Sequence, residues 1–166
     1  MICFACGGDF APGEGAAHAY MASTPGCWES YGLVLAREYE DPRLFAACHR
    51  LTVDAYAVQH PGDGTDIRAT RSFWVHLAAL DLVLNRGRDE AAARSAMARL
   101  SAVVPPSLPP HRIAKQTHAD VLTAPRAAHA DAVRSWASLT LLANADALPI
   151  LHAWIEESER VAPGKR

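Results

Sequence analysis

Hydrophobic residues recur at helical spacing along most of the chain, and no convincing strand pattern interrupts them. The first such segment begins at Trp28, and apolar side chains return every three or four residues, at Tyr31, Leu35 and Tyr39. This period is typical of an amphipathic helix. Glu38 falls between these positions, so we expect it on the polar face of that helix.

Turn-forming residues divide the rest of the chain into further helices. Asp41 can cap a new helix and Pro42 suits its first position, while the glycines and prolines of residues 61–64 end it. A Pro-rich stretch follows the fourth helix, and Thr117 is expected to cap one helical turn. The expected helical segments are 42–60, 66–85, 89–104 and 125–157, the last broken near 144–149, with fraying at 162–166.

These segments predict an all-α fold, a helical bundle of five or six helices formed by a single domain over residues 1–166. A chain of this length buries enough surface for its own core. The expected parts are an irregular metal-binding loop (1–27), a four-helix core (28–104), a Pro-rich connector (105–124) and C-terminal helices (125–158). A loop as long as the first part needs something to order it.

Charge and hydropathy exclude several classes of partner. The formal net charge is −2, and no broad basic stripe is present, so we expect no nucleic acid partner. No apolar run approaches the ~18 residues of a membrane span, and the first residues lack the pattern of a signal peptide. We therefore expect a cytoplasmic protein whose partner is a small molecule or another protein, and whose four cysteines are thiols or metal ligands.

The strongest chemical signal is Cys3-x-x-Cys6-Gly7-Gly8, joined by Cys27 just before the first helix. Two residues between cysteines let both thiolates reach one ion, and the glycines let the backbone fold around the sulfurs. The helix N-terminus also favours the thiolate of Cys27. We expect zinc here. Redox chemistry or inert buried thiols are the alternatives, although a redox Cys-x-x-Cys usually follows a βαβ pattern.

The fourth zinc ligand is open at this point. Candidates are His18 in the loop, and Cys48, His49 and His60 on the second helix. In an antiparallel helical hairpin Cys27 lies opposite roughly Asp54, so His49 and His60 miss it by similar distances in opposite directions.

A second feature is a histidine-bearing face. In the second helix His49, Val53, Tyr56 and His60 follow one another at i, i+4, i+7 and i+11, and therefore share one side. Such a histidine is often a hydrogen-bonded core residue, but histidines beside a carboxylate also serve acid–base chemistry. The candidate pocket comprises His18, Asp54, Tyr56, His60 and His76. The scattered histidines at 111, 118, 129 and 152 are expected at the surface or as caps.

Several of these residues together resemble an uncharacterised bacterial family, a small domain of unknown function, over most of residues 1–155. The resemblance rests on Cys3-x-x-Cys6-Gly7, on residues 23–28, on residues 38–42 and most specifically on the His-x-Leu-Thr-Val-Asp-Ala-Tyr-x-x-Gln-His-Pro motif of residues 49–61. It implies that the cysteines and the second-helix histidines belong to one pattern, which favours His49 over His18 as fourth ligand. Cys48 stands where that family has valine. The resemblance implies no activity.

Two functions follow as hypotheses. The first is a small zinc-binding helical protein, a binding or accessory protein whose structural zinc is held by Cys3, Cys6, Cys27 and His49. The alternative is a small metal-dependent or acid–base enzyme that uses a histidine-lined cleft between the second and third helices. Whether the chain is an enzyme is left open by the sequence.

Overall fold

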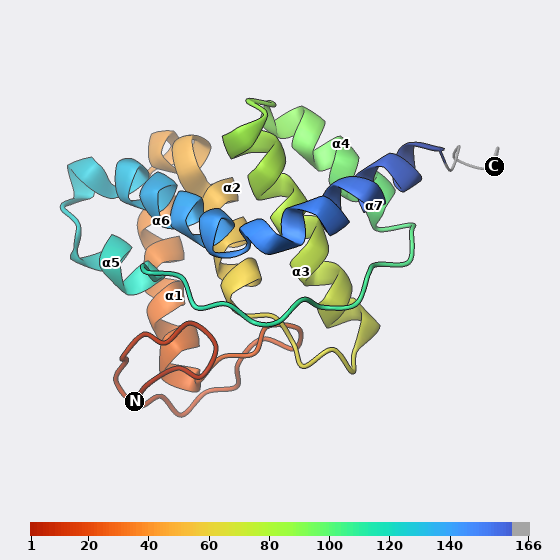
Figure 1. Ribbon diagram of the computed structural model, residues 1–166. Helices are drawn as coiled ribbons and strands as arrows, with labels where there is room; N and C mark the ends of the chain where they lie inside the picture. Colours follow the sequence, from red (N-terminus) through yellow and green to blue (C-terminus); the bar gives the residue numbers. More distant parts are fainter. Residues whose placement is uncertain (161–166) are drawn as a thin grey trace.

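The computed structural model describes residues 1–160, and these form a helical bundle (Figure 1). The expected all-α class is confirmed, with seven α-helices in the described part of the chain rather than five or six. The helices are α1 (Pro25–Tyr39), α2 (Pro42–Gln59), α3 (Ile67–Leu80), α4 (Glu90–Leu100), α5 (His118–Thr123), α6 (His129–Ala143) and α7 (Leu148–Arg160). The expected fraying at 162–166 lies outside the described residues.

Local sequence explains where the helices begin. The carboxylate of Asp41 accepts hydrogen bonds from the backbone N–H groups of Arg43 and Leu44, and thereby caps α2. Thr117 and Asp120 form a reciprocal capping box at α5, which lengthens the single expected turn into a short helix. The predicted break after α6 is confirmed, since a 3₁₀ turn at Ala145–Ala147 separates α6 from α7.

The buried face of α1 differs from the expected one. The helix buries Cys27, Tyr31, Val34 and Glu38, at i, i+4, i+7 and i+11, whereas Tyr39 is exposed. The exposed fraction is 0% for Glu38 and 66% for Tyr39, so the expectation of a polar, outward Glu38 was wrong. Cys27 and Val34 lie on the buried face of the helix. Glu38 lies on the same face because His49, Thr52 and His129 form hydrogen bonds with its carboxylate in the interior.

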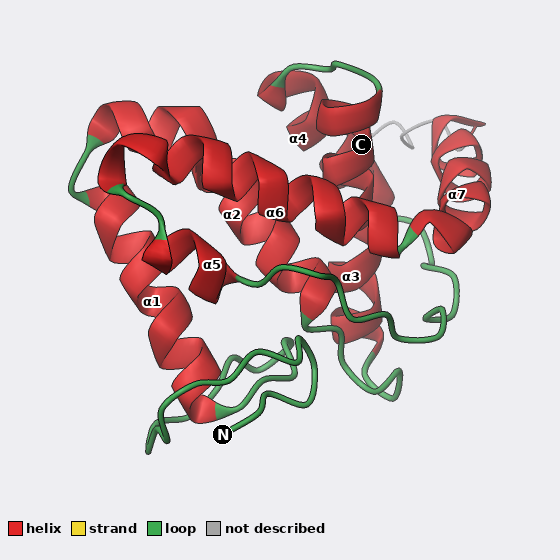
Figure 2. Ribbon diagram, turned by 60° about the vertical axis from the view of Figure 1, so that its left-hand side comes forward, coloured by secondary structure: helices red, strands yellow, loops and turns green. Residues whose placement is uncertain are grey.

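Helix α2 lies at the centre of the arrangement and packs against α1, α3 and α6 (Figure 2). Helix α5 lies against α1 and α6, and α7 packs on α3 and α4. Large fully buried side chains such as Trp74, Trp136 and Leu77 fill the common core. Within residues 1–160, no helix is both long and apolar enough to cross a lipid bilayer.

The Pro-rich connector is extended but anchored. It crosses the molecule from α4 to α5 (Figure 1), and two buried indoles donate to its backbone: Trp74 to the carbonyl of Pro106 and Trp154 to that of Val104, each at 2.9 Å. His111 in the same segment donates to the carbonyl oxygen of Ala5 at 2.6 Å. The connector therefore links the bundle to the N-terminal loop.

Candidate metal centre

Four ligand-type side chains converge where the N-terminal loop meets the bundle. They are Cys3, Cys6, Cys27 and His60, and their ligand atoms all lie within 4.8 Å of one another. All four residues are almost completely buried, at 0, 1, 0 and 0% exposure. Three segments supply them: the loop, the first turn of α1 and the residue that caps the end of α2.

The first two cysteines sit on a tight turn. The backbone N–H of Cys3 donates to the carbonyl of Gly8 at 2.8 Å, and the N–H of Gly7 donates back to the carbonyl of Cys3 at 2.9 Å. Gly7 has a φ of 74°, in the left-handed region that glycine occupies without strain. This turn points both sulfurs to one side, as the Cys-x-x-Cys-Gly spacing predicted.

The third cysteine is positioned by close packing at the start of α1. A Cβ added to Gly26 would lie 1.8 Å from the carbonyl oxygen of Ala11, so the loop backbone rests directly on this helix turn. The neighbouring Cys27 then lies with its Sγ 3.9 Å from that of Cys6. Its place in the first helical turn also favours negative charge on the sulfur.

The histidine is oriented by its own helix. His60 Nδ1 lies 2.8 Å from the carbonyl oxygen of Tyr56, and a carbonyl only accepts, so Nδ1 carries the proton. The other ring nitrogen, Nε2, is left with its lone pair and lies 3.3 Å from Cys27 Sγ. A ligating histidine commonly donates its second nitrogen to a backbone carbonyl in this way. The loop follows this end of the helix, since Ala22 donates to the carbonyl of His60 at 3.1 Å.

The donor separations suit a tetrahedral zinc ion. Bonds of about 2.3 Å to sulfur and about 2.0 Å to nitrogen place two sulfurs about 3.8 Å apart and a sulfur and a nitrogen about 3.5 Å apart. The observed separations are 3.9 Å for Cys6 to Cys27 and 3.3 Å for Cys27 to His60. Three thiolates and one imidazole are also a common donor set for structural zinc.

An aromatic shell surrounds this group. Tyr56 stacks on Tyr31 and on His60 with ring centroids 3.8 and 3.9 Å apart, and its hydroxyl lies 3.5 Å from Cys27 Sγ. Burial raises the pKa of Tyr56 well above its usual range, so the hydroxyl keeps its proton and can donate to a thiolate. His118 closes the shell and stacks on Phe10 at 4.8 Å.

The three thiols differ in pKa when no cation is bound. Hydrogen bonds with Cys3 and Cys6, and then burial, raise the pKa of Cys27 far above its usual range. For Cys6 a hydrogen bond with Cys27 favours the thiolate, but the Cys3 side chain and burial outweigh it and raise the pKa to about 11. Hydrogen bonds from Cys27 and Cys6 lower the pKa of Cys3. Without a metal, burial therefore opposes ionisation of Cys6 and Cys27, and negative charge is favoured on Cys3.

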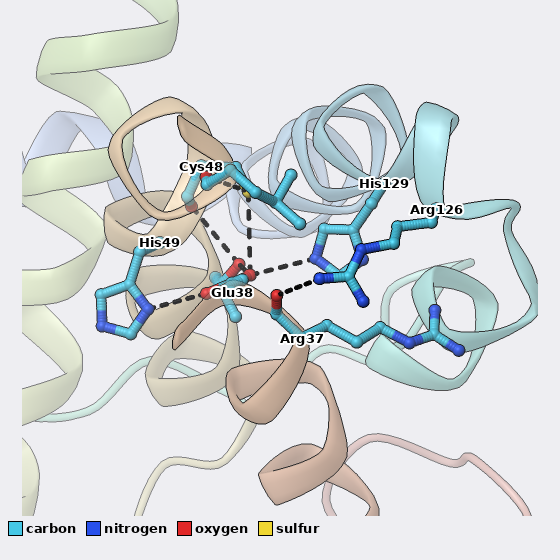
Figure 3. A network of polar contacts seen from close by, with 8 residues as sticks. Arg37, Glu38, Cys48, His49, Arg126 and His129 are labelled. Atoms are coloured by element: carbon cyan, nitrogen blue, oxygen red, sulfur yellow. Dashed lines mark hydrogen bonds and ion pairs between the residues drawn. The ribbon is translucent and has the colours of Figure 1, made fainter. Parts of the chain in front are cut away.

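The structure places His49 elsewhere. Its Nδ1 lies 2.7 Å from Oε2 of the buried Glu38 (Figure 3). The other carboxylate oxygen, Oε1, accepts the hydroxyl of Thr52 at 2.5 Å and lies 3.2 Å from Nε2 of His129. Cys48 Sγ lies 3.8 Å from the same carboxylate. Burial, and then the charge of Glu38, raise the pKa of the Cys48 thiol to about 12. His60, rather than His49 or Cys48, is therefore the residue that lies beside the three sulfurs.

The five residues of the predicted pocket lie in three places. Tyr56 and His60 belong to the cysteine group. His76 Nδ1 donates to the buried carboxylate of Asp54 at 2.7 Å, between α3 and α2. His18 lies in the loop, where its ring centroid is 5.3 Å from that of Trp28 and its Nδ1 accepts from the N–H of Tyr20.

Two histidines expected at the surface or as caps are buried. His118 and His129 have 0% exposure, although each occupies the first position of a helix. The expectation failed because both helix starts turn inward, toward Tyr56 and Glu38 respectively. The sequence signal for His129 was weak, because its partner Glu38 comes from a distant segment.

These features define a small all-α protein with a buried group of three cysteines and one histidine at the junction of its N-terminal loop and two helices. The chain belongs to a family of unknown function, DUF5946, whose model matches residues 1–145. The resemblance to an uncharacterised family is thereby confirmed. Neither a curated protein nor a solved structure matches the chain significantly.

Proposed function

We propose that Cys3, Cys6, Cys27 and His60 hold a structural zinc ion that fixes the N-terminal loop to the helical bundle. The observation that carries this proposal is the convergence of four buried donors at the separations a tetrahedral zinc requires. A divalent ion would compensate the thiolate charge that burial otherwise opposes. His60 replaces His49 in the ligand set because only His60 reaches the sulfurs.

The closed character of the group supports a structural role for the metal rather than a catalytic one. Catalytic zinc sites keep one position for water or substrate, whereas four protein donors complete the shell of a structural site. The metal would thus act by ordering residues 1–27, and the protein would be a binding or accessory protein for a small molecule or another protein. Four free cysteines suit a reducing compartment such as the cytoplasm.

A matched pair of histidine variants tests the ligand set. His60→Gln should lose the zinc ion of this group, so it should copurify with one zinc fewer per chain than the wild type, and the loop should become susceptible to limited proteolysis because it loses its anchor. His18→Gln changes the same residue type in the same region but removes no proposed donor, so its zinc content should equal that of the wild type. Equal zinc content in both variants would exclude His60 as a ligand.

A second candidate function rests on the pair formed by His76 and Asp54. Asp54 is completely buried and also binds Arg50 through two hydrogen bonds of 2.9 and 2.8 Å, so it is firmly held beneath the imidazole. His76 borders an open pocket of about 300 Å³ that Arg68, Arg71 and Ser72 also line. A histidine oriented by a carboxylate beside two arginines suits acid–base chemistry on an anionic substrate.

Inorganic phosphate serves as a probe of that pocket. In an NMR titration, millimolar phosphate should shift the resonances of the His76 ring, and Arg71→Gln should weaken the effect because it removes a cation from the pocket. Arg160→Gln, on an exposed helix end, is the control. Unchanged His76 resonances, or the same shift in all three proteins, would remove the support for this second function.

A further inference from the structure

A second group of metal-ligand side chains lies far from the first. Glu38, Cys48 and His129 come from the last turn of α1, from α2 and from the start of α6, and their ligand atoms all lie within 4.8 Å of one another. In Figure 3 the three side chains meet in the interior between these helices. Glu38 is eleven residues beyond Cys27 on α1, about 16 Å along the axis, so the two groups are separate.

The carboxylate of Glu38 is buried without a permanent cation. In the part of the chain that the structure describes, its ion-pair partners are only the imidazoles of His49 and His129. The nearby arginines are engaged elsewhere: Arg37 donates to the carbonyl of Leu122, and Arg126 pairs with Glu40. A buried carboxylate needs compensation, which must come from a proton on one of these groups or from a bound cation.

We propose that Glu38, Cys48 and His129 bind a second zinc ion. The separation from Glu38 Oε1 to His129 Nε2 is 3.2 Å and that to Cys48 Sγ is 3.8 Å. A tetrahedral zinc ion places an oxygen and a nitrogen about 3.3 Å apart and an oxygen and a sulfur about 3.5 Å apart, close to both values. One carboxylate and one thiolate also balance the charge of a divalent ion, so the filled site is neutral in the interior.

His49 positions the carboxylate in this site. Its Nδ1–H donates to Oε2 of Glu38 at 2.7 Å, while Oε1 faces Cys48 and His129 and also accepts the hydroxyl of Thr52. A hydrogen bond to the non-ligating oxygen is how carboxylate ligands are commonly oriented around a metal. The histidine that the sequence favoured as a ligand of the first zinc is thus a positioning residue of the second.

Zinc content per chain tests this site independently of the first. The proteins are the wild type, Cys48→Val and Cys6→Ser, each expressed with zinc and freed of loosely bound metal by gel filtration. We expect two zinc ions per wild-type chain and one in each variant. Valine is chosen for position 48 because it is small and apolar, and so keeps this buried part of the core filled.

Cobalt substitution provides a second readout. The four proposed thiolate ligands of the cobalt-loaded wild type become three in Cys48→Val, so the thiolate-to-cobalt absorption should fall by about a quarter. One zinc in the wild type, kept in Cys48→Val and lost in Cys6→Ser, would reduce the Glu38 group to a hydrogen-bonded network and overturn this proposal alone. One zinc kept in Cys6→Ser and lost in Cys48→Val would support it and overturn the first site instead. If a variant does not fold, the wild type still decides: two zinc ions support both sites, and if there is one, the cobalt absorption of three thiolates identifies the first site and that of one thiolate the second.

Discussion

His60 donates its Nδ1–H to the carbonyl oxygen of Tyr56, one helical turn earlier and 2.8 Å away. Through this one bond the end of α2 selects the tautomer that turns Nε2 toward Cys27. A carbonyl freed at a helix C-terminus would otherwise need water or another donor. The same bond therefore completes the helix and prepares the histidine to bind a metal.

Loss of a cysteine from the Cys-x-x-Cys turn should lower the stability of the whole fold. Cys6→Ala removes a proposed zinc ligand, and because metal binding is coupled to folding, we expect it to cost on the order of 3 kcal/mol or more of unfolding free energy. For a chain of this size that corresponds to a fall in Tm of roughly 6–12 °C. Thermal denaturation followed by circular dichroism measures it. A variant that melts like the wild type would contradict a structural zinc.

Two glycines of α1 offer a matched comparison. Gly26→Ala should destabilise the protein and lower its zinc affinity, because the added Cβ would collide with the carbonyl oxygen of Ala11 beside Cys27. Gly32→Ala meets nothing within 4 Å and should instead stabilise the helix, by about 0.5–1 kcal/mol. Denaturant titrations and competition with a zinc chelator measure the two effects. Similar values for both variants would mean that the loop does not rest on α1 as described.

Zinc binding should release protons. In the metal-free group hydrogen bonds among the cysteines, together with burial, raise the pKa values of Cys6 and Cys27 and so favour their protonated thiols at neutral pH. Binding therefore displaces protons from these thiols, and zinc affinity should rise as the pH rises through neutrality. Calorimetry in two buffers of different ionisation enthalpy counts the protons. A heat of binding independent of the buffer would contradict thiolate ligation.

His118 should make the protein sensitive to acid. Burial, and then the nearby His60, lower the pKa of His118 to about 3, well below the ordinary value of about 6.5. The unfolded chain binds a proton at this residue between these two pH values while the folded chain does not. The stability it contributes is therefore complete above about pH 6.5 and declines as the pH falls, by up to about 1.4 kcal/mol per unit.

The variant His118→Phe tests the pH-dependent part of the stability that is due to His118. Phenylalanine can keep the parallel stacking on Phe10 but has no proton to bind. With excess zinc present in both proteins, the variant should lose less unfolding free energy than the wild type between pH 7 and pH 5. Parallel pH profiles in urea denaturation would show that His118 contributes nothing to acid sensitivity.

Much of the fold followed from hydrophobic spacing and turn residues. Asp41-Pro42 marked the junction of α1 and α2, and the interruption after α6 was visible in the sequence. The sequence did not show which face of α1 is buried, because Leu35 and Tyr39 form an apolar stripe next to the face that is actually buried. A buried carboxylate such as Glu38 becomes recognisable only when its partners from α2 and α6 are in place.

The candidate site was predictable where its residues are close in sequence. Cys3 and Cys6 lie on one tight turn, and their two-residue spacing is typical of such a turn. Cys27 lies in the first turn of α1, which the sequence also indicated. The choice between His49 and His60 depends instead on how two helices and the loop pack. Both lie on one side of α2, but they have different partners. His49 forms a hydrogen bond with Glu38, whereas His60 lies beside Cys27, where the N-terminal loop meets the helices.

X-ray absorption spectroscopy at the zinc edge tests the central claim most directly. The suitable protein is Cys48→Val, in which only the group of Cys3, Cys6, Cys27 and His60 retains its full set of donors. We predict one zinc per chain with three sulfur neighbours at about 2.3 Å and one nitrogen at about 2.0 Å. An absence of zinc in the folded protein, or a shell of oxygen and nitrogen without sulfur, would contradict the account.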